Sequence, residues 1–178
     1  SAVLGMGGYV TGPGAVAARL SGRALIIHEQ NAIPGLTNRL VAKIAQRVLT
    51  GLDAQLGRLD QREWIGNPIR AEIAATPQPA DRYEGRTGPA RVLVIGGSLG
   101  ARTLNQVVPA ALAQLPVACR PLIRHQAGER TLETAKAAYA NAGVKADITA
   151  FIADMAQAYA WCDLVICRAG ALTVSELA

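Results

Sequence analysis

The sequence alternates, along most of its length, between short apolar runs, turns containing glycine, and segments whose apolar residues recur at helical spacing. Residues 24–27 form one such run, and Leu36, Leu40 and Ile44 then follow at helical spacing. The rhythm becomes more regular from residue 91 onward. Since a helix returns the chain to the start of the next parallel strand, this alternation predicts an α/β fold with parallel sheets and right-handed crossovers.

The expected elements group into two Rossmann-like pieces. We expect strands near 24–27, 63–65, 91–95, 121–125, 147–152 and 164–167, and helices from 36, after residue 100, near 129–141 and 155–161, and from 172. The helix after residue 100 is predicted to have one apolar face, which comprises Leu104, Val107, Val108, Ala111, Leu112 and Leu115. Residues 47–50 fit either a helix end or another strand. Proline and glycine are frequent in 76–90, which favours a linker there.

The division predicts one domain over 1–68 and a second over 69–178. The chain opens on residues that resemble the end of a strand, and it closes inside a helical pattern without a glycine or proline stop. We therefore expect both domains to be incomplete in this chain.

Composition and charge narrow the function. With 51% hydrophobic and 17% charged residues the chain is not disordered. The net charge of +5 favours an anionic partner, which leaves phosphorylated substrates, an acidic membrane face or nucleic acid. Nucleic acid ranks last, because the positive charges are scattered and only 4% of residues are aromatic. No apolar run has the roughly 18 residues that a membrane-spanning helix needs, and no signal peptide opens the chain.

The most informative loop is 96–102, Gly-Gly-Ser-Leu-Gly-Ala-Arg, between an apolar strand and an amphipathic helix. Backbone amides at a helix start bind phosphate, and the Ser98 hydroxyl adds a donor. A tight turn without a ligand is the alternative. The residues at 122–125, Leu-Ile-Arg-His, contain no acid for the ribose of NAD, although Arg124 leaves NADP open.

Two other segments are candidate ligand-binding loops. Residues 168–173 form a second glycine turn between a strand and a helix, and Glu176 follows one helical turn later. That carboxylate has two interpretations. It can accept hydrogen bonds from ribose hydroxyls, or it is an ordinary glutamate in the first turn of a helix, stabilised by the helix dipole. Residues 5–14 hold five glycines, which implies a close backbone approach to a ligand or to another element. The two histidines, His28 and His125, lack partners at metal spacing, so we expect no metal site.

Taken in order, these motifs resemble the MurG family of bacterial glycosyltransferases, and the resemblance covers essentially the whole chain. The motifs that carry it are Gly-Met-Gly-Gly-Tyr-Val-Thr-Gly-Pro at 5–13, His-Glu-Gln-Asn at 28–31, Gly-Leu-Thr-Asn at 35–38, Gly-Asn-Pro-Ile-Arg at 66–70, the loop at 96–102, Phe-Ile-Ala-Asp-Met at 151–155, and Arg-Ala-Gly-Ala-Leu-Thr-Val-Ser-Glu at 168–176.

The resemblance implies a GT-B fold, in which an N-terminal domain binds the acceptor and a C-terminal domain binds the sugar donor. It implies a peptidoglycan enzyme, peripheral on the cytoplasmic face of the inner membrane. Such an enzyme inverts the anomeric centre as it moves N-acetylglucosamine (GlcNAc) from UDP-GlcNAc to lipid I, giving lipid II and UDP. No cofactor or metal is implied, and nucleic acid is not expected as a partner.

The resemblance also assigns residues. The implied donor contacts are Asn31, Arg70, Ser98, Ile152, Ala171, Leu172, Thr173, Val174, Ser175 and Glu176. Ile152 is expected at the uracil, Glu176 at the ribose and Ser98 at the diphosphate. The implied loop for the acceptor diphosphate comprises Gly7, Gly8, Tyr9 and Thr11. The family's candidate catalytic base falls upstream of Ser1, so we expect the chain alone to be inactive. Rival interpretations are a transferase for another nucleotide sugar, a nucleotide-binding module and an NADPH-dependent reductase.

Overall fold

A computed structural model describes the chain except residues 55, 57–61 and 98–99. The chain forms two compact units. Unit 1 comprises Ser1–Arg70 together with Ala169–Ala178, and unit 2 comprises Ala71–Arg168. The predicted domain division at residues 68 and 69 stays a prediction.

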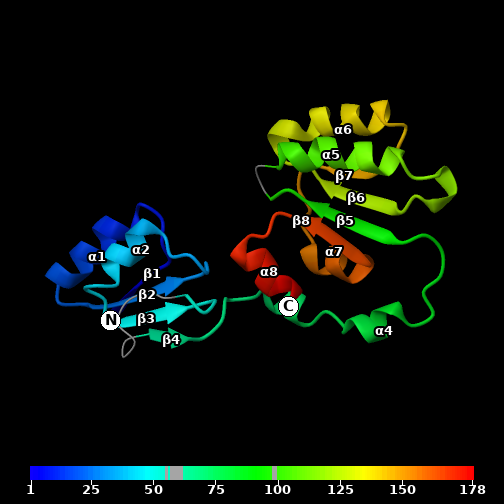
Figure 1. The fold of residues 1–178 in the computed structure, drawn as a ribbon. Coiled ribbons are helices and arrows are strands. Elements are labelled where there is room, and N and C mark those ends of the chain that lie inside the picture. The colour runs from blue at the N-terminus through cyan, green and yellow to red at the C-terminus, as the bar shows by residue number, and fades with distance from the viewer. Residues whose placement is uncertain (55, 57–61, 98–99) are drawn as a thin grey trace. The chain divides into compact units, whose positions relative to one another are not determined.

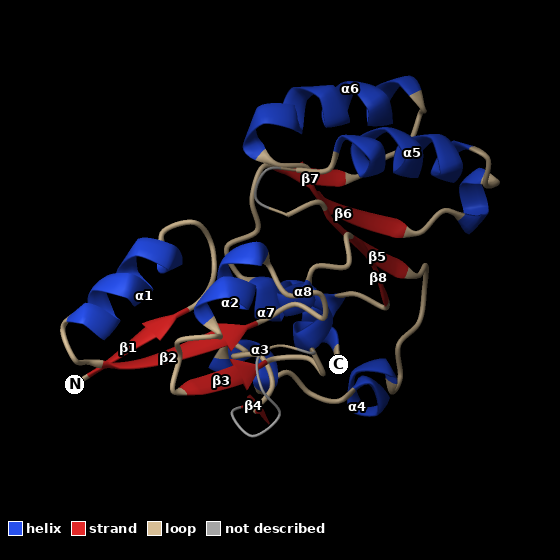
Figure 2. Cartoon of the chain, turned by 60° about the vertical axis from the view of Figure 1, so that its left-hand side comes forward, coloured by secondary structure: helices blue, strands red, loops and turns tan. Residues whose placement is uncertain are grey.

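Unit 1 contains a parallel sheet with two helices over one face (Figure 2). Its strands are hydrogen-bonded in the order in which they occur along the chain, β1-β2-β3-β4. The elements of unit 1 are β1 (Ala2–Gly5), α1 (Thr11–Leu20), β2 (Ala24–Glu29), α2 (Leu36–Val41), β3 (Arg47–Thr50), β4 (Arg62–Trp64) and α8 (Ala171–Leu177).

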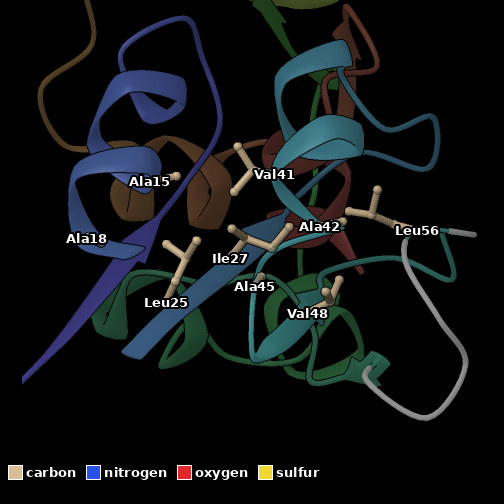
Figure 3. Packing of buried hydrophobic residues seen from close by; sticks show 9 residues of the cluster. All are labelled: Ala15, Ala18, Leu25, Ile27, Val41, Ala42, Ala45, Val48 and Leu56. Carbon is tan, nitrogen blue, oxygen red and sulfur yellow. The ribbon is translucent and has the colours of Figure 1, made fainter. Parts of the chain in front are cut away.

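The core of unit 1 lies between the sheet and these two helices. Leu25 and Ile27, alternate residues of β2, are fully buried and point toward α1 and α2 (Figure 3). Small residues on the helices, such as Ala15 and Ala42, let the backbones of helix and strand approach closely. The polar end of β2 is thereby carried to the edge of the sheet on a rigid strand.

Unit 2 is a second parallel sheet, ordered β7-β6-β5-β8, with α5 and α6 on one face and α7 on the other (Figure 1). The elements of unit 2 are α3 (Ala71–Ala74), α4 (Pro79–Tyr83), β5 (Arg91–Ile95), α5 (Arg102–Ala113), β6 (Leu122–Gln126), α6 (Leu132–Asn141), β7 (Asp147–Thr149), α7 (Met155–Trp161) and β8 (Leu164–Cys167), with short 3₁₀ turns at Val117–Cys119 and Glu129–Thr131.

The central strand β5 is buried on both faces. Leu93 and Ile95 pack with residues of α7, whereas Val92 and Val94 pack with residues of α5 and α6. A strand covered on both faces reads as a continuous apolar run, which is why 91–95 was predicted as a buried strand.

The segment predicted as a linker is more ordered than its composition indicates. It contains helix α4, and its arginines hold the end of α7: Arg82 donates to the carbonyls of Tyr159 and Cys162, and Arg86 pairs with Asp163. The carbonyls at a helix end have no partner within the helix, so arginine side chains satisfy them.

Most predicted elements are confirmed, and several differ. Helix α3 was not predicted, and β7 ends at Thr149 rather than at 152. The region 47–50 is a strand rather than a helix end, and α2 stops at Val41. Helix α1 was not predicted at all. The apolar face predicted for the helix after residue 100 is partly wrong, because Val107 and Leu115 are exposed while Val108 is buried.

A buried histidine makes the stability of unit 2 depend on pH. His125 on β6 is fully buried, with Nδ1 2.9 Å from the Tyr139 hydroxyl. Burial lowers the pKa of His125 from 6.5 to about 4, since the charged imidazolium is poorly solvated there. In the unfolded chain the ring takes up a proton below pH 6.5, so the free energy of unfolding falls as the pH drops from 6.5 toward 4.

We expect this loss to reach up to about 3 kcal/mol. Denaturant unfolding at pH 7 and pH 4.5 measures it. A double variant, His125→Phe with Tyr139→Phe, removes the titrating ring and the hydroxyl that faces it. The same pH dependence in this variant would assign the effect to other groups.

Candidate functional site

The loops of unit 1 that carry polar motifs emerge from one edge of its sheet. Strands β1 and β2 are parallel and in register, with Gly5 beside Ile27. The glycine-rich segment after β1 and the polar residues that end β2 therefore leave the sheet side by side. This edge is the usual ligand-binding position in parallel α/β sheets.

A cavity of about 290 Å³ opens at that edge. It brings together the predicted acceptor loop and the predicted donor contact Asn31. The residues that line it are Met6, Gly7, Gly8, Tyr9, Glu29, Gln30, Asn31, Gly35, Leu36, Thr37 and Asn38.

The Glu29 carboxylate organises one wall of this cavity. Glu29 is only 2% exposed, and Oε1 accepts hydrogen bonds from the backbone N–H and the side-chain amide of Asn31, both at 2.9 Å. Oε2 accepts from the Gly35 N–H at 3.1 Å and from the Asn38 amide at 2.9 Å. Burial alone would raise the pKa of Glu29, but the four hydrogen bonds outweigh it and lower the pKa below 4.5. The buried group is therefore a carboxylate at neutral pH.

The acceptor loop approaches Asn38 at the same amide nitrogen that donates to Glu29. Gly7 has a φ of 87°, and a Cβ atom there would lie 3.3 Å from the Asn38 amide nitrogen. The Thr11 hydroxyl donates to the Gly7 carbonyl at 2.5 Å. A glycine at this position thus serves both the backbone conformation and the close approach to Asn38.

His28 has a structural role in the described geometry. Its ring is 3% exposed, and Nε2 lies 3.0 Å from the Gly66 carbonyl oxygen. This contact holds the segment that follows β4 against the end of β2. It agrees with a hydrogen-bonded structural histidine rather than a general acid or base.

The segment after Gly66 in turn contacts α8. The Asn67 amide donates to the Ser175 hydroxyl at 2.9 Å, and Arg70 donates through Nε and Nη2 to Oε1 of Glu176 at 3.3 and 3.0 Å. Arg70 and Glu176, two predicted donor contacts 106 residues apart in the sequence, therefore lie together. On the same helix Leu172 and Val174 are exposed, and Ala171 and Thr173 are partly buried.

In unit 2 the predicted uracil contact, Ile152, is anchored by a glutamine. The Ile152 N–H donates to Oε1 of Gln126, which is 4% exposed and ends strand β6. Ser98 lies outside the described residues. Its expected contact with the diphosphate therefore stays a prediction.

Part of the glycine content of the 96–102 loop has a packing cause. A Cβ atom at Gly100, where φ is 76°, would overlap the Ala127 carbonyl oxygen and lie 2.5 Å from the Thr131 hydroxyl. A Cβ atom at Gly96 would lie 2.5 Å from the Ala101 nitrogen. Packing therefore accounts for the glycines at these two positions, and phosphate binding at the loop stays a prediction.

Sequence reasoning missed the residues that hold the predicted contacts in place. Glu29, Asn38, Asn67 and Gln126 were not assigned roles, although a charged or amide side chain at the carboxyl end of an apolar parallel strand is a usable signal for Glu29 and Gln126.

The part of the chain that the structure describes contains no cluster of three His, Cys, Asp or Glu side chains that could hold a metal ion. Within the same residues, no helix is long and apolar enough to cross a membrane.

The two parallel sheets, with helices packed on them and polar loops at their carboxyl edges, fit the GT-B class of α/β fold. The glycosyltransferase family 28 N-terminal domain matches residues 1–50, and the family 28 C-terminal domain matches residues 91–178. The chain belongs to glycosyltransferase family 28.

Relatives point to one branch of this family. A protein of Alkalilimnicola ehrlichii named UDP-N-acetylglucosamine–N-acetylmuramyl-(pentapeptide) pyrophosphoryl-undecaprenol N-acetylglucosamine transferase is 61% identical over 178 residues, which is 99% of this chain and 49% of that protein. A protein of the same name from Marinobacter nauticus is 55% identical over 98% of this chain and 48% of its own length. The crystal structure of Acinetobacter baumannii MurG matches with a TM-score of 0.76 at 40% identity, covering 99% of this chain and 49% of that one. The chain spans about half the length of the curated relatives it matches.

The crowding at Gly100 predicts that a side chain at this position destabilises the protein. We expect Gly100→Ala to lower the free energy of unfolding by about 3 kcal/mol, because it combines a positive φ with a steric overlap. Gly143→Ala is the matched control: its φ is 61°, and open space surrounds the added methyl group. This control should cost about 1 kcal/mol. Denaturant unfolding compares the two, and equal losses would show that the overlap is relieved without cost.

Proposed function

We propose that the protein transfers GlcNAc from UDP-GlcNAc to lipid I, producing lipid II and UDP for peptidoglycan synthesis. This is the activity that the names of its relatives state. Family membership and the similarity to MurG over 99% of the chain support the proposal.

The observation that carries it is the meeting of Arg70 with Glu176. Both were assigned to the sugar donor from the sequence, and a hydrogen-bonded ion pair at 3.0 Å brings them together. A carboxylate can accept two ribose hydroxyl groups, and the neighbouring guanidinium can bind the diphosphate in two-point geometry. One nucleoside diphosphate carries both of these groups.

The remaining donor contacts fit the same ligand. Ile152 meets the uracil in this proposal, and Ser98 with the amides of its loop meets the diphosphate. The departing UDP gains negative charge as the glycosidic bond breaks, so Arg70 and the amides at the start of α5 stabilise it in the transition state. Asn31 faces the sugar, and the residues Ala171, Leu172, Thr173, Val174 and Ser175 shape the donor site along α8.

The cavity of unit 1 fits the acceptor. In the proposal, the backbone of Gly7 and Gly8 binds the diphosphate of lipid I, with Tyr9 and Thr11 beside it. The glycine conformations allow N–H groups to approach phosphate oxygens closely. The muramoyl 4-hydroxyl then attacks the anomeric carbon from the face opposite the UDP, which inverts that centre.

Work at a membrane surface follows from the acceptor. The names of the relatives contain pyrophosphoryl-undecaprenol, a lipid carrier. We propose that the protein is peripheral on the cytoplasmic face of the inner membrane, where a net charge of +5 favours anionic headgroups.

Donor binding tests the proposal directly. Calorimetric titration of the complete protein should detect binding of UDP and UDP-GlcNAc but not of NADPH. Glu176→Gln should weaken UDP-GlcNAc binding by about tenfold or more, because hydrogen bonds to a charged acceptor are each worth about 1.5–3 kcal/mol.

Glu133→Gln is the matched control. It makes the same chemical change on the exposed surface of α6, where Glu133 pairs only with Lys136 among the described residues. This variant should keep the donor affinity of the unaltered protein. NADPH binding would instead favour the reductase interpretation, and unchanged affinity in Glu176→Gln would contradict the ribose role.

A further inference from the structure

Glu29 is placed to act on both substrates without touching either. It is almost fully buried, yet its four hydrogen bonds reach three separate points of the 31–38 segment: Asn31, Gly35 and Asn38. That segment supplies five of the eleven residues that line the unit 1 cavity.

The first branch runs to Asn31. Oε1 of Glu29 accepts from both the backbone and the side chain of Asn31, so the amide plane of this exposed residue is held at two points. The amide nitrogen is engaged by Glu29, and the amide oxygen lies on the other side of the same planar group. Asn31 therefore presents a hydrogen-bond acceptor in a fixed direction, which suits a sugar hydroxyl.

The second branch runs through Asn38 to the glycine loop. The Asn38 amide nitrogen donates to Oε2 of Glu29 at 2.9 Å and to the His28 carbonyl at 3.3 Å. The same nitrogen is the atom closest to the position that a Cβ atom on Gly7 would take. Since Asn38 is 1% exposed, it can move only if Glu29 or the Gly7 backbone moves with it.

We propose that Glu29 is a positioning residue that fixes, through Asn31 and Asn38, the geometry of the sugar-donor contact and of the acceptor diphosphate loop relative to each other. The inference rests on the proposed function, because it assigns the two branches to the two substrates. Relative placement of two reactants is a large source of rate enhancement in transfer reactions.

The negative charge is essential to this role. Four N–H donors converge on the two oxygens, and a carboxylate has only acceptors to offer. A glutamine of the same shape would turn an N–H₂ group toward the donors of one branch. Glu29→Gln is thus isosteric, yet it disrupts one of the two branches.

The test uses steady-state kinetics of the complete protein with UDP-GlcNAc and a lipid I analogue. Glu29→Gln should lower kcat at least tenfold and raise KM for one or both substrates at least fivefold. Leu25→Ala is the control for plain destabilisation: it removes a fully buried side chain from the same strand, and that side chain faces the helices rather than the cavity. This control should lower Tm and leave both KM values within twofold.

A double-mutant cycle identifies the donor branch. If Glu29 acts on the donor through Asn31, combining Glu29→Gln with Asn31→Ala should raise KM for UDP-GlcNAc by less than the product of the two single effects. Full multiplicative effects would overturn the positioning role at the donor. Asn38→Ser tests the other branch should Glu29→Gln fail to accumulate: it should raise KM for the acceptor at least fivefold and leave that for UDP-GlcNAc within twofold.

The outcomes separate the two claims. Unaltered protein that transfers no GlcNAc to the acceptor would overturn the proposed function, and this inference with it. Active protein in which Glu29→Gln changes Tm alone, with kcat and both KM values within twofold, would overturn the positioning role and leave the proposed function intact.

Discussion

A carboxylate removed from water sets the geometry of the first unit. Isolating the charge of Glu29 would be very costly, so its burial requires that donors surround it. Asn31, Gly35 and Asn38 supply them from one segment, which must therefore fold back over the end of β2. One wall of the cavity takes its position from that requirement.

The parallel sheets explain why polar residues far apart in sequence meet. In-register parallel strands end at one edge, and each glycine turn leaves the sheet there. In unit 2 the same arrangement pairs Ile95 with Gln126, so the loop after β5 and the anchor of Ile152 start from neighbouring positions. The two units repeat one plan, in which an apolar strand delivers a polar group to the edge.

Sequence patterns predicted the positions of the strands more reliably than those of the helices. Strand 91–95 is unambiguous because both of its faces are buried. Helix α1 was missed because Gly12, Pro13 and Gly14 open it, and these residues are typical of loops. Pro13 is nevertheless tolerated, since the first-turn N–H groups have no partner within the helix.

The hydrogen bonds that hold the candidate site residues in place could not be predicted from the sequence, for a different reason. Asn67 and Ser175 are 108 residues apart, and no local pattern links an asparagine before a proline to a serine in the last helix. A separation of 108 residues lies far beyond the window over which helix or strand periodicity gives a signal. Even at Glu29, the strand end indicates a polar site, but only the fold reveals that four donors converge on it.

The two key carboxylates differ in a way that suits their proposed roles. The Glu176 side chain is 16% exposed and that of its partner Arg70 is 52% exposed, so their ion pair is partly open to solvent and contributes about 1 kcal/mol. Ribose hydroxyls and a diphosphate can therefore replace the partners of Arg70 and Glu176 at little cost. Glu29, which is 2% exposed, cannot exchange its donors in this way. In the proposed function, the buried carboxylate maintains the shape of the site, while the more accessible one exchanges partners with the ligand.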